Sequence, residues 1–331
     1  MEQIVVILVA LVKSVIVFFG LIMAAAYMTL TERKVLAWMQ GRIGPNRVGP
    51  WGMMQPLADA VKAMFKEDAI PDGADKFVFW LAPVIAVMAS MMTFAVIPVG
   101  PRVNIFGLPV DLQVADVSVG ILVILAVSSL GVYGIVLAGW SSNSKYSYLG
   151  SVRSSAQMIS YELGMGLAIL SVVVTVGSLR ISDIVGFQAA VPLVLVQPLA
   201  FILYTICAIA ENNRPPFDLP EAEQERVQGY MTEYSGLKFA MFYLAEYVNM
   251  VTISSVATTL FLGSYHGPIA DGPWWFVIKV AALLFGYIWL RATLPRLRYD
   301  RLMRLGWQVI LPISLLNVVV TAVVVTMMAS A

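Results

Sequence analysis

Long apolar segments constrain this chain more than any other feature, because each is close to the roughly 20 residues that a helix needs to cross a membrane. Hydrophobic residues make up 60% of the 331 positions and charged residues only 12%. The backbone in lipid must form its own hydrogen bonds, and no alternating barrel pattern is present, so we expect an all-α, polytopic membrane bundle. About eight transmembrane helices are predicted, at about 3–31, 77–98, 118–139, 158–180, 191–210, 241–263, 275–291 and 309–328.

Positive charges divide the connecting segments into two sets. All but four of the 21 Lys and Arg residues lie in, or at the ends of, the segments that follow the first, third, fifth and seventh apolar stretches. By the positive-inside rule this places both termini on the outer side of the membrane. The exceptions are Lys13, Arg102, Arg180 and Lys279. The predicted cytoplasmic loops are about 32–76, 140–157, 211–240 and 292–308.

The first apolar stretch is longer than the ~7–15-residue core of a cleavable signal, so we expect a retained anchor. No repeat or linker composition marks a second unit, and residues 1–331 are predicted to form a single integral membrane domain. Cys207 and His266 are the only cysteine and histidine. The chain alone therefore offers no disulfide framework and no thiolate or multi-histidine metal site, and we expect no covalently bound cofactor.

The first inner loop combines tight-turn residues with an amphipathic stretch from about Met53 to Phe65. One interpretation is an ordinary positively charged loop. The other is a helix on the membrane surface, with Asp59 and Lys62 toward a cavity. The face toward the lipid boundary would carry Met53, Met54, Leu57, Val61, Met64 and Phe65. Methionine and phenylalanine beside a few polar groups suit an isoprenoid quinone.

Three acids lie inside predicted membrane helices or at their ends: Glu162, Glu211 and Glu246. A charge at the bilayer centre costs roughly 2.5–3.5 kcal/mol, so such residues are rarely idle. With ~1.5 Å rise per residue, all three occupy one band roughly 0–10 Å from the inner face. They are predicted to face one another along a hydrated polar path. The alternative is that each acid is bonded separately to a neighbouring tyrosine, namely Tyr161, Tyr243 or Tyr247.

Two further charged stretches lie on the predicted inner side. Residues 218–225 hold four carboxylates, and Asp218 with Glu221 has capping-box spacing at a helix start. Glu221 and Glu225 stand four residues apart, where like charges repel, which indicates protonation or a basic partner. Residues 291–304 hold five arginines next to a membrane helix, a pattern typical of anionic lipid binding or of topology fixing. The stretch is too short for a nucleic-acid interface.

Together these residues resemble the H subunit of bacterial NADH-quinone oxidoreductase, the family of mitochondrial NADH dehydrogenase subunit 1. The resemblance covers essentially the whole chain. Two residues depart from the family pattern: Arg226, where an apolar residue is common, and Met231, where many members carry histidine. The matching blocks are TERK at 31–34, GRIGPNRVGP at 41–50, QPLADAVK at 55–62, SKYSYLGSVRSSAQMISYE at 144–162, ENNRPPFDLPEAEQE at 211–225, GYMTEYSGLKFA at 229–240, AEY at 245–247 and RATLPRLRYDRLM at 291–303.

The resemblance implies a subunit of a proton-pumping translocase that forms part of the quinone cavity and of a carboxylate path for protons. The residues implied to border the quinone path are Arg33, Arg42, Asp59, Lys62, Phe65 and Arg291. Those implied to form the proton path are Glu32, Glu162, Glu211, Glu221, Glu223, Glu225 and Glu246. No residue of this chain is expected to be catalytic in itself.

The resemblance further implies that quinone is the substrate and that NADH, FMN and iron–sulfur clusters bind partner subunits. The implied partners are peripheral-arm subunits B, D and I, membrane subunits A, J and K, and lipids, in a bacterial inner membrane. An alternative is the homologous membrane anchor of an energy-converting hydrogenase. A secondary transporter is a third possibility, but it predicts inverted repeats and broken helices, and the acids here lie near one face.

Overall fold

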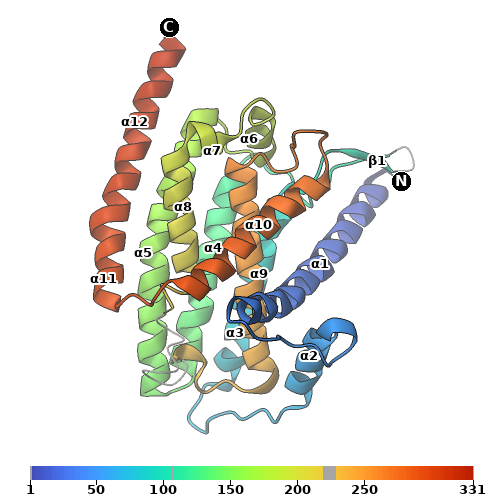
Figure 1. Ribbon diagram of the computed structural model, residues 1–331, viewed down its shortest axis with the longest axis vertical. Coiled ribbons are helices and arrows are strands. Elements are labelled where there is room, and N and C mark those ends of the chain that lie inside the picture. The colour runs from blue at the N-terminus through green and yellow to red at the C-terminus, as the bar shows by residue number, and fades with distance from the viewer. Residues whose placement is uncertain (1, 106–107, 219–228, 331) are drawn as a thin grey trace.

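The computed structural model describes residues 2–105, 108–218 and 229–330 (Figure 1). Over these residues the only strands form one short antiparallel hairpin, β1 (Val103–Ile105) with β2 (Leu108–Val110), so the predicted all-α class is confirmed. The α-helices are α1 (Glu2–Met39), α2 (Gln55–Phe65), α3 (Lys76–Thr93), α4 (Gly120–Ser141), α5 (Lys145–Val176), α6 (Ile181–Phe187), α7 (Leu193–Val196), α8 (Pro198–Glu211), α9 (Gly236–Phe261), α10 (Pro273–Thr293), α11 (Tyr299–Arg304) and α12 (Leu311–Ser330).

In the described part of the chain, seven helices are long and apolar enough to cross a membrane. They are α1, α3, α4, α5, α9, α10 and the continuous run from α11 through the π-helical segment Leu305–Ile310 to α12. The remaining predicted segment, 191–210, is divided into α7 and α8. Pro198 opens α8, and proline cannot continue a preceding helix because it has no amide hydrogen and its ring clashes with the preceding turn. The Gln197 side chain donates to the Thr175 and Thr321 hydroxyls, which holds this break against α5 and α12.

The prediction of a loop over 140–157 is wrong, because α5 already begins at Lys145. The first turns of α5 carry small polar side chains that pack inward instead of facing solvent. Ser147 is fully buried and donates to the Tyr230 carbonyl oxygen at 3.0 Å. A hydropathy profile cannot distinguish such a polar helical extension from a loop.

The helices form a bundle with α3, α4, α5, α8 and α9 at its centre, and α12 packs along α5 (Figure 1). On another side, α1 and α10 run obliquely across α9, and α2 lies beside α1 and α9 at the end where α1 finishes. Because lipid is as apolar as a leucine side chain, the hydrophobic effect does not drive helices together in a membrane. Close helix contact depends instead on small residues, which let the backbones approach each other. At the α3–α4 contact, a Cβ at Gly134 would lie 3.1 Å from the Ala82 carbonyl oxygen.

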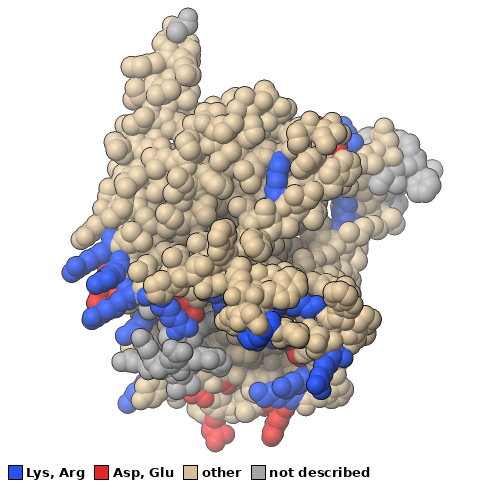
Figure 2. All heavy atoms as spheres, viewed as in Figure 1, with Lys and Arg blue, Asp and Glu red and all other residues tan. Residues whose placement is uncertain are grey.

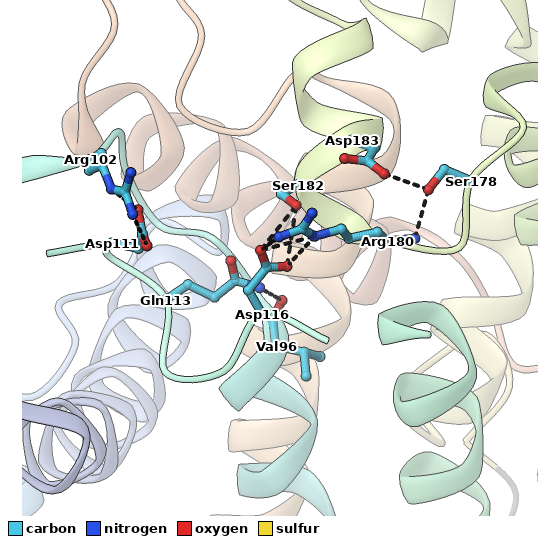
Figure 3. Close-up of polar contacts among 9 residues, drawn as sticks. All are labelled: Val96, Arg102, Asp111, Gln113, Asp116, Ser178, Arg180, Ser182 and Asp183. Atoms are coloured by element: carbon cyan, nitrogen blue, oxygen red, sulfur yellow. Dashed lines mark hydrogen bonds and ion pairs between the residues drawn. The ribbon is translucent and has the colours of Figure 1, made fainter. Parts of the chain in front are cut away.

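Charged side chains gather at the end of the molecule near α2 and α11, while the face over α1 and α10 carries few (Figure 2). The opposite end, predicted to be the outer one, has separate ion pairs (Figure 3). There the Arg180 Nε lies 3.1 and 3.0 Å from the two carboxylate oxygens of Asp116, and this guanidinium lowers the pKa of Asp116. The pair connects the segment between α3 and α4 to the start of α6.

Candidate functional site

A cavity of about 510 Å³ lies between α1, α2 and α9, and we call it the α2 cavity. Arg33 from α1 and Asp59 and Lys62 from α2 all line it. The Arg33 Nη1 atom lies 2.6 Å from Asp59 Oδ2, and the Gln55 amide donates to Asp59 Oδ1 at 2.9 Å. The walls are otherwise largely alanines and the tyrosines of α9. The cavity therefore offers a few polar donors in an otherwise mostly apolar enclosure.

The α2 helix is amphipathic in the way that the sequence predicts, with its large apolar side chains turned away from the α2 cavity. The exposed apolar side chains of α2 and of the two residues before it are Met53, Met54, Leu57, Val61, Met64 and Phe65. Phe65 is 87% exposed and does not line the cavity. Arg42 also lies apart from it: its side chain is exposed and donates to Gln40. Of the six residues implied for the quinone path, only Arg33, Asp59 and Lys62 thus line this cavity.

Glu32 lies at the centre of an ionic cluster that contains Arg214, Glu246, Tyr247 and Arg291, of which Arg291 is the most exposed. The Arg214 Nη1 atom lies 3.2 Å from Glu32 Oε1, and the Tyr247 hydroxyl donates to Glu32 Oε2 at 2.7 Å. Arg291 also donates to Glu32. Two guanidinium groups balance two carboxylates, which reduces the cost of burying them. We call these five residues the Glu32 cluster.

A second, smaller cavity of about 70 Å³ borders the cluster and is lined by Glu211 and Glu246 together with several amides and hydroxyls. Such a volume has room for water molecules that bridge polar groups. Ser128 also lines it and lies 3.5 Å from a carboxylate oxygen of Glu162. The three membrane acids predicted to share one depth therefore all approach this polar cavity.

Within the described residues, Glu162 and Glu211 form no ion pair, in contrast to Glu32 and Glu246. Of the three tyrosines in the alternative, Tyr161 is bonded elsewhere, because its hydroxyl donates to the Leu302 carbonyl oxygen at 2.9 Å, and Tyr247 donates to Glu32. Glu221, Glu223 and Glu225 lie outside the described residues, as does Arg226. Asp218 forms an ion pair with Arg296 at 3.0 Å.

Sequence reasoning missed Arg214, which bridges two of the implied proton-path acids. The signal was present, since Arg214 is the single basic residue in ENNRPPFDLP, directly after a membrane helix that ends in an acid. Its position relative to Glu32 depends on contacts between helices far apart in sequence. Across the ranges that the structure describes, no three potential metal ligands of the His, Cys, Asp or Glu type gather in one place.

Comparison with known proteins yields one family and close relatives over nearly the whole chain. Residues 12–322 match the family model described as NADH dehydrogenase. One of the NADH-quinone oxidoreductase H subunits of Geobacter metallireducens is 54% identical over 328 residues, which cover 95% of each chain. The corresponding H subunit of Thermomicrobium roseum is 52% identical over 309 residues, covering 90% of this chain and 91% of the relative. The H subunit of Deinococcus radiodurans is 52% identical, covering 96% of this chain and 83% of the relative.

Proposed function

Because the chain belongs to the NADH dehydrogenase family, as a membrane subunit of NADH:quinone oxidoreductase, we propose that it binds quinone and couples quinone reduction to proton movement. It is a multi-pass subunit of an oxidoreductase complex whose substrate is quinone. NADH, FMN and iron–sulfur clusters bind other subunits, which deliver electrons to the quinone head group.

The α2 cavity is the part of the structure that best supports quinone binding. Its volume of about 510 Å³ falls within the roughly 300–1,000 Å³ typical of ligand pockets. A quinone head group has carbonyl oxygens that accept hydrogen bonds, and Arg33 and Lys62 supply donors at the cavity. Asp59 holds Arg33 in place and leaves Lys62 as the more adaptable donor. Arg42 and Phe65 are proposed to contribute only through contacts outside this cavity.

The Glu32 cluster and the cavity lined by Glu211 and Glu246 form the proposed proton path. Added negative charge on a reduced quinone attracts guanidinium groups, so it shifts the balance of Arg291 and Arg214 between their carboxylate partners. Glu246 lies at both the cluster and the polar cavity, so it is placed to pass this change on to Glu211 and Glu162. Glu221, Glu223 and Glu225 remain proposed members of the path.

We also propose the partners and the membrane location. The peripheral subunits B, D and I would dock on the charged end of the molecule, and the membrane subunits A, J and K on its apolar sides, in a bacterial inner membrane. Charges gathered near α2 and α11 support a cytoplasmic location for that end and an outer location for both termini (Figure 2). Residues 1–331 would form one membrane domain. The similarity to H subunits of NADH-quinone oxidoreductases favours a quinone enzyme over a hydrogenase anchor.

The test is inhibitor-sensitive NADH:quinone reductase activity in membranes that carry Arg33→Ala or Asp59→Asn, with assembly of the complex checked on the same sample. Both variants are expected to assemble and to lose at least about tenfold in activity, or in apparent quinone affinity, because they remove the donor or its support. Arg298→Ala is the matched control, since Arg298 is exposed and pairs with Asp300 away from the cavity. Unchanged activity and quinone affinity in both variants would contradict quinone binding at the α2 cavity and would leave Arg33 and Asp59 with a structural role only.

A further inference from the structure

The chain segment at the end of α8 carries two residues of the proposed path, Glu211 and Arg214. We call residues 211–217 the α8 turn. Figure 1 shows α5 and α8 running side by side. They approach closely, since a Cβ atom at Gly164 of α5 would lie 3.0 Å from the Cys207 sulfur of α8. Side chains of α5 can therefore reach the backbone of the α8 turn.

The α8 turn begins with a sharp change of direction. Asn213 has a φ of 49°, in the left-handed region that asparagine tolerates better than most residues. Its amide donates to the Ala210 carbonyl oxygen at 3.2 Å, and the Arg214 amide donates to that of Ile209 at 3.4 Å. These two bonds are those of a Schellman motif at a helix end. The motif sets the direction in which the chain leaves α8 and hence the place from which the Arg214 side chain starts.

Gln157 of α5 bonds both ends of the α8 turn. Its side chain is fully buried, and its amide nitrogen donates to the Ala210 carbonyl oxygen at 2.8 Å and to that of Phe217 at 2.9 Å. Both acceptors are carbonyl oxygens, so only a side chain with two N–H donors can bond the pair. A single amide group thus fixes the backbone immediately before Glu211 and at the last residue of the turn.

Ser154 gives the α8 turn a third attachment to α5. It lies one helical turn before Gln157, on the same face of the helix, and is also fully buried. The Asn213 side-chain amide donates to the Ser154 hydroxyl oxygen at 3.2 Å. This bond holds the residue whose left-handed backbone directs Arg214.

Neither Gln157 nor Ser154 is among the described residues that line the α2 cavity or the polar cavity. Their effect on the path would pass through the α8 turn. Arg214 bonds Glu246 at 2.6 Å and Glu32 at 3.2 Å, and Coulomb energies at such distances in a buried site change steeply with small displacements. The position of the α8 turn consequently decides how Arg214 is shared between its two carboxylates.

We propose that Gln157, assisted by Ser154, is a positioning residue for the proton path. It holds Arg214 between its two carboxylates and Glu211 at the polar cavity. This inference rests on the proposed function, because it assigns a role in the same path. A bond that served only the fold would affect stability alone, whereas a positioning role also controls the turnover of complexes that have assembled fully.

The experiment separates stability from turnover. Gln157→Met removes both donors and keeps the length of the side chain, and Ser154→Ala is a milder change that decides the matter if Gln157→Met fails to assemble. Tyr161→Phe is the matched control on α5. It removes a buried hydrogen bond to a different segment, at the Leu302 carbonyl oxygen, and keeps the ring against Phe217. Assembly, unfolding midpoint, kcat and KM for quinone, and proton translocation are measured on the intact complex in proteoliposomes.

The proposal predicts that Gln157→Met lowers kcat per assembled complex and proton translocation by about tenfold, because the path is displaced. KM for quinone should stay unchanged, since the α2 cavity is intact. Ser154→Ala should lower kcat by about threefold, the scale of one hydrogen bond. Tyr161→Phe should lower the unfolding midpoint and leave kcat at the wild-type value.

Wild-type kcat in an assembled Gln157→Met or Ser154→Ala complex would overturn the positioning role. So would a loss of kcat in Tyr161→Phe as large as that in Gln157→Met, or a change confined to KM. Failure of the proposed path itself is distinguishable, because Glu211→Gln would then keep full activity and pumping. Loss of both in Glu211→Gln, together with full activity in Gln157→Met, would overturn the positioning role alone.

Discussion

The Nε atom of Arg214 lies 2.6 Å from Oε1 of Glu246, while Nη1 of the same guanidinium lies 3.2 Å from Glu32. One side chain from the segment after α8 thus connects carboxylates of α1 and α9. Its carbon lies 4.6 Å from the centre of the Tyr247 ring, which adds a cation–π contact. Arg214 therefore connects Glu32 to Glu246, the member of the cluster that also lines the polar cavity.

Arg214→Met is expected to destabilise the protein by about 3–5 kcal/mol, because it leaves the carboxylates of Glu246 and Glu32 with less compensation in a buried site. The measurement is the thermal unfolding midpoint of the purified complex, with assembly followed on native gels. Arg298→Met, at an exposed pair with Asp300, serves as the control and should shift the midpoint little. An Arg214→Met complex as stable as wild type would contradict a stabilising role for the ion pairs of Arg214 with Glu32 and Glu246.

The ion pair of Lys238 and Asp68 predicts different losses of stability for substitutions of its two members. The Lys238 side chain is fully buried, lies 2.8 Å from Asp68 and rests 4.2 Å from the centre of the Trp80 ring. Asp68→Asn leaves a buried ammonium group without its counter-charge, which typically costs about 3–5 kcal/mol. Lys238→Met replaces the charge by an apolar chain of similar length and should be nearly neutral. A lower unfolding midpoint for Lys238→Met than for Asp68→Asn would contradict a buried, charged Lys238 that depends on Asp68.

Asp116 should make the stability of the predicted outer end depend on pH. Arg180 lowers the pKa of Asp116 below its ordinary value of 3.8. A lowered pKa in the folded state stabilises the fold fully above the ordinary value, and this contribution is lost as pH falls through the folded value. The difference in unfolding midpoint between wild type and Asp116→Asn should stay constant from about pH 8 to about pH 5 and shrink only below about pH 4. A difference that disappears near neutral pH would show that the pair in Figure 3 is not formed.

Hydropathy predicted the spanning helices well because lipid permits few alternatives to an apolar helix. It could not predict that residues 145–157 continue α5, since their burial comes from contacts with Tyr230 and its neighbours. The division of segment 191–210 had a visible cause in Pro198, yet proline also occurs inside intact membrane helices, such as Pro83 in α3.

The candidate functional site was also predictable only in part. Counting residues from the inner face gave the common depth of Glu162, Glu211 and Glu246, because depth depends only on position along a helix. Depth says nothing about the rotation of a helix about its axis. For that reason the sequence did not reveal that Arg214 and Tyr247 converge on Glu32, or that Phe65 points away from the α2 cavity.

The most direct test of the proposed coupling measures quinone reduction and proton translocation together in proteoliposomes that contain the Glu211→Gln complex. Glu211 is buried at the polar cavity and has no ion-pair partner among the described residues, so the amide removes a proton carrier with little change in shape. We predict that both inhibitor-sensitive quinone reduction and proton translocation fall at least about tenfold, while Glu67→Gln, at an exposed loop position, leaves both intact. Full activity and full pumping in an assembled Glu211→Gln complex would contradict the proposed carboxylate path.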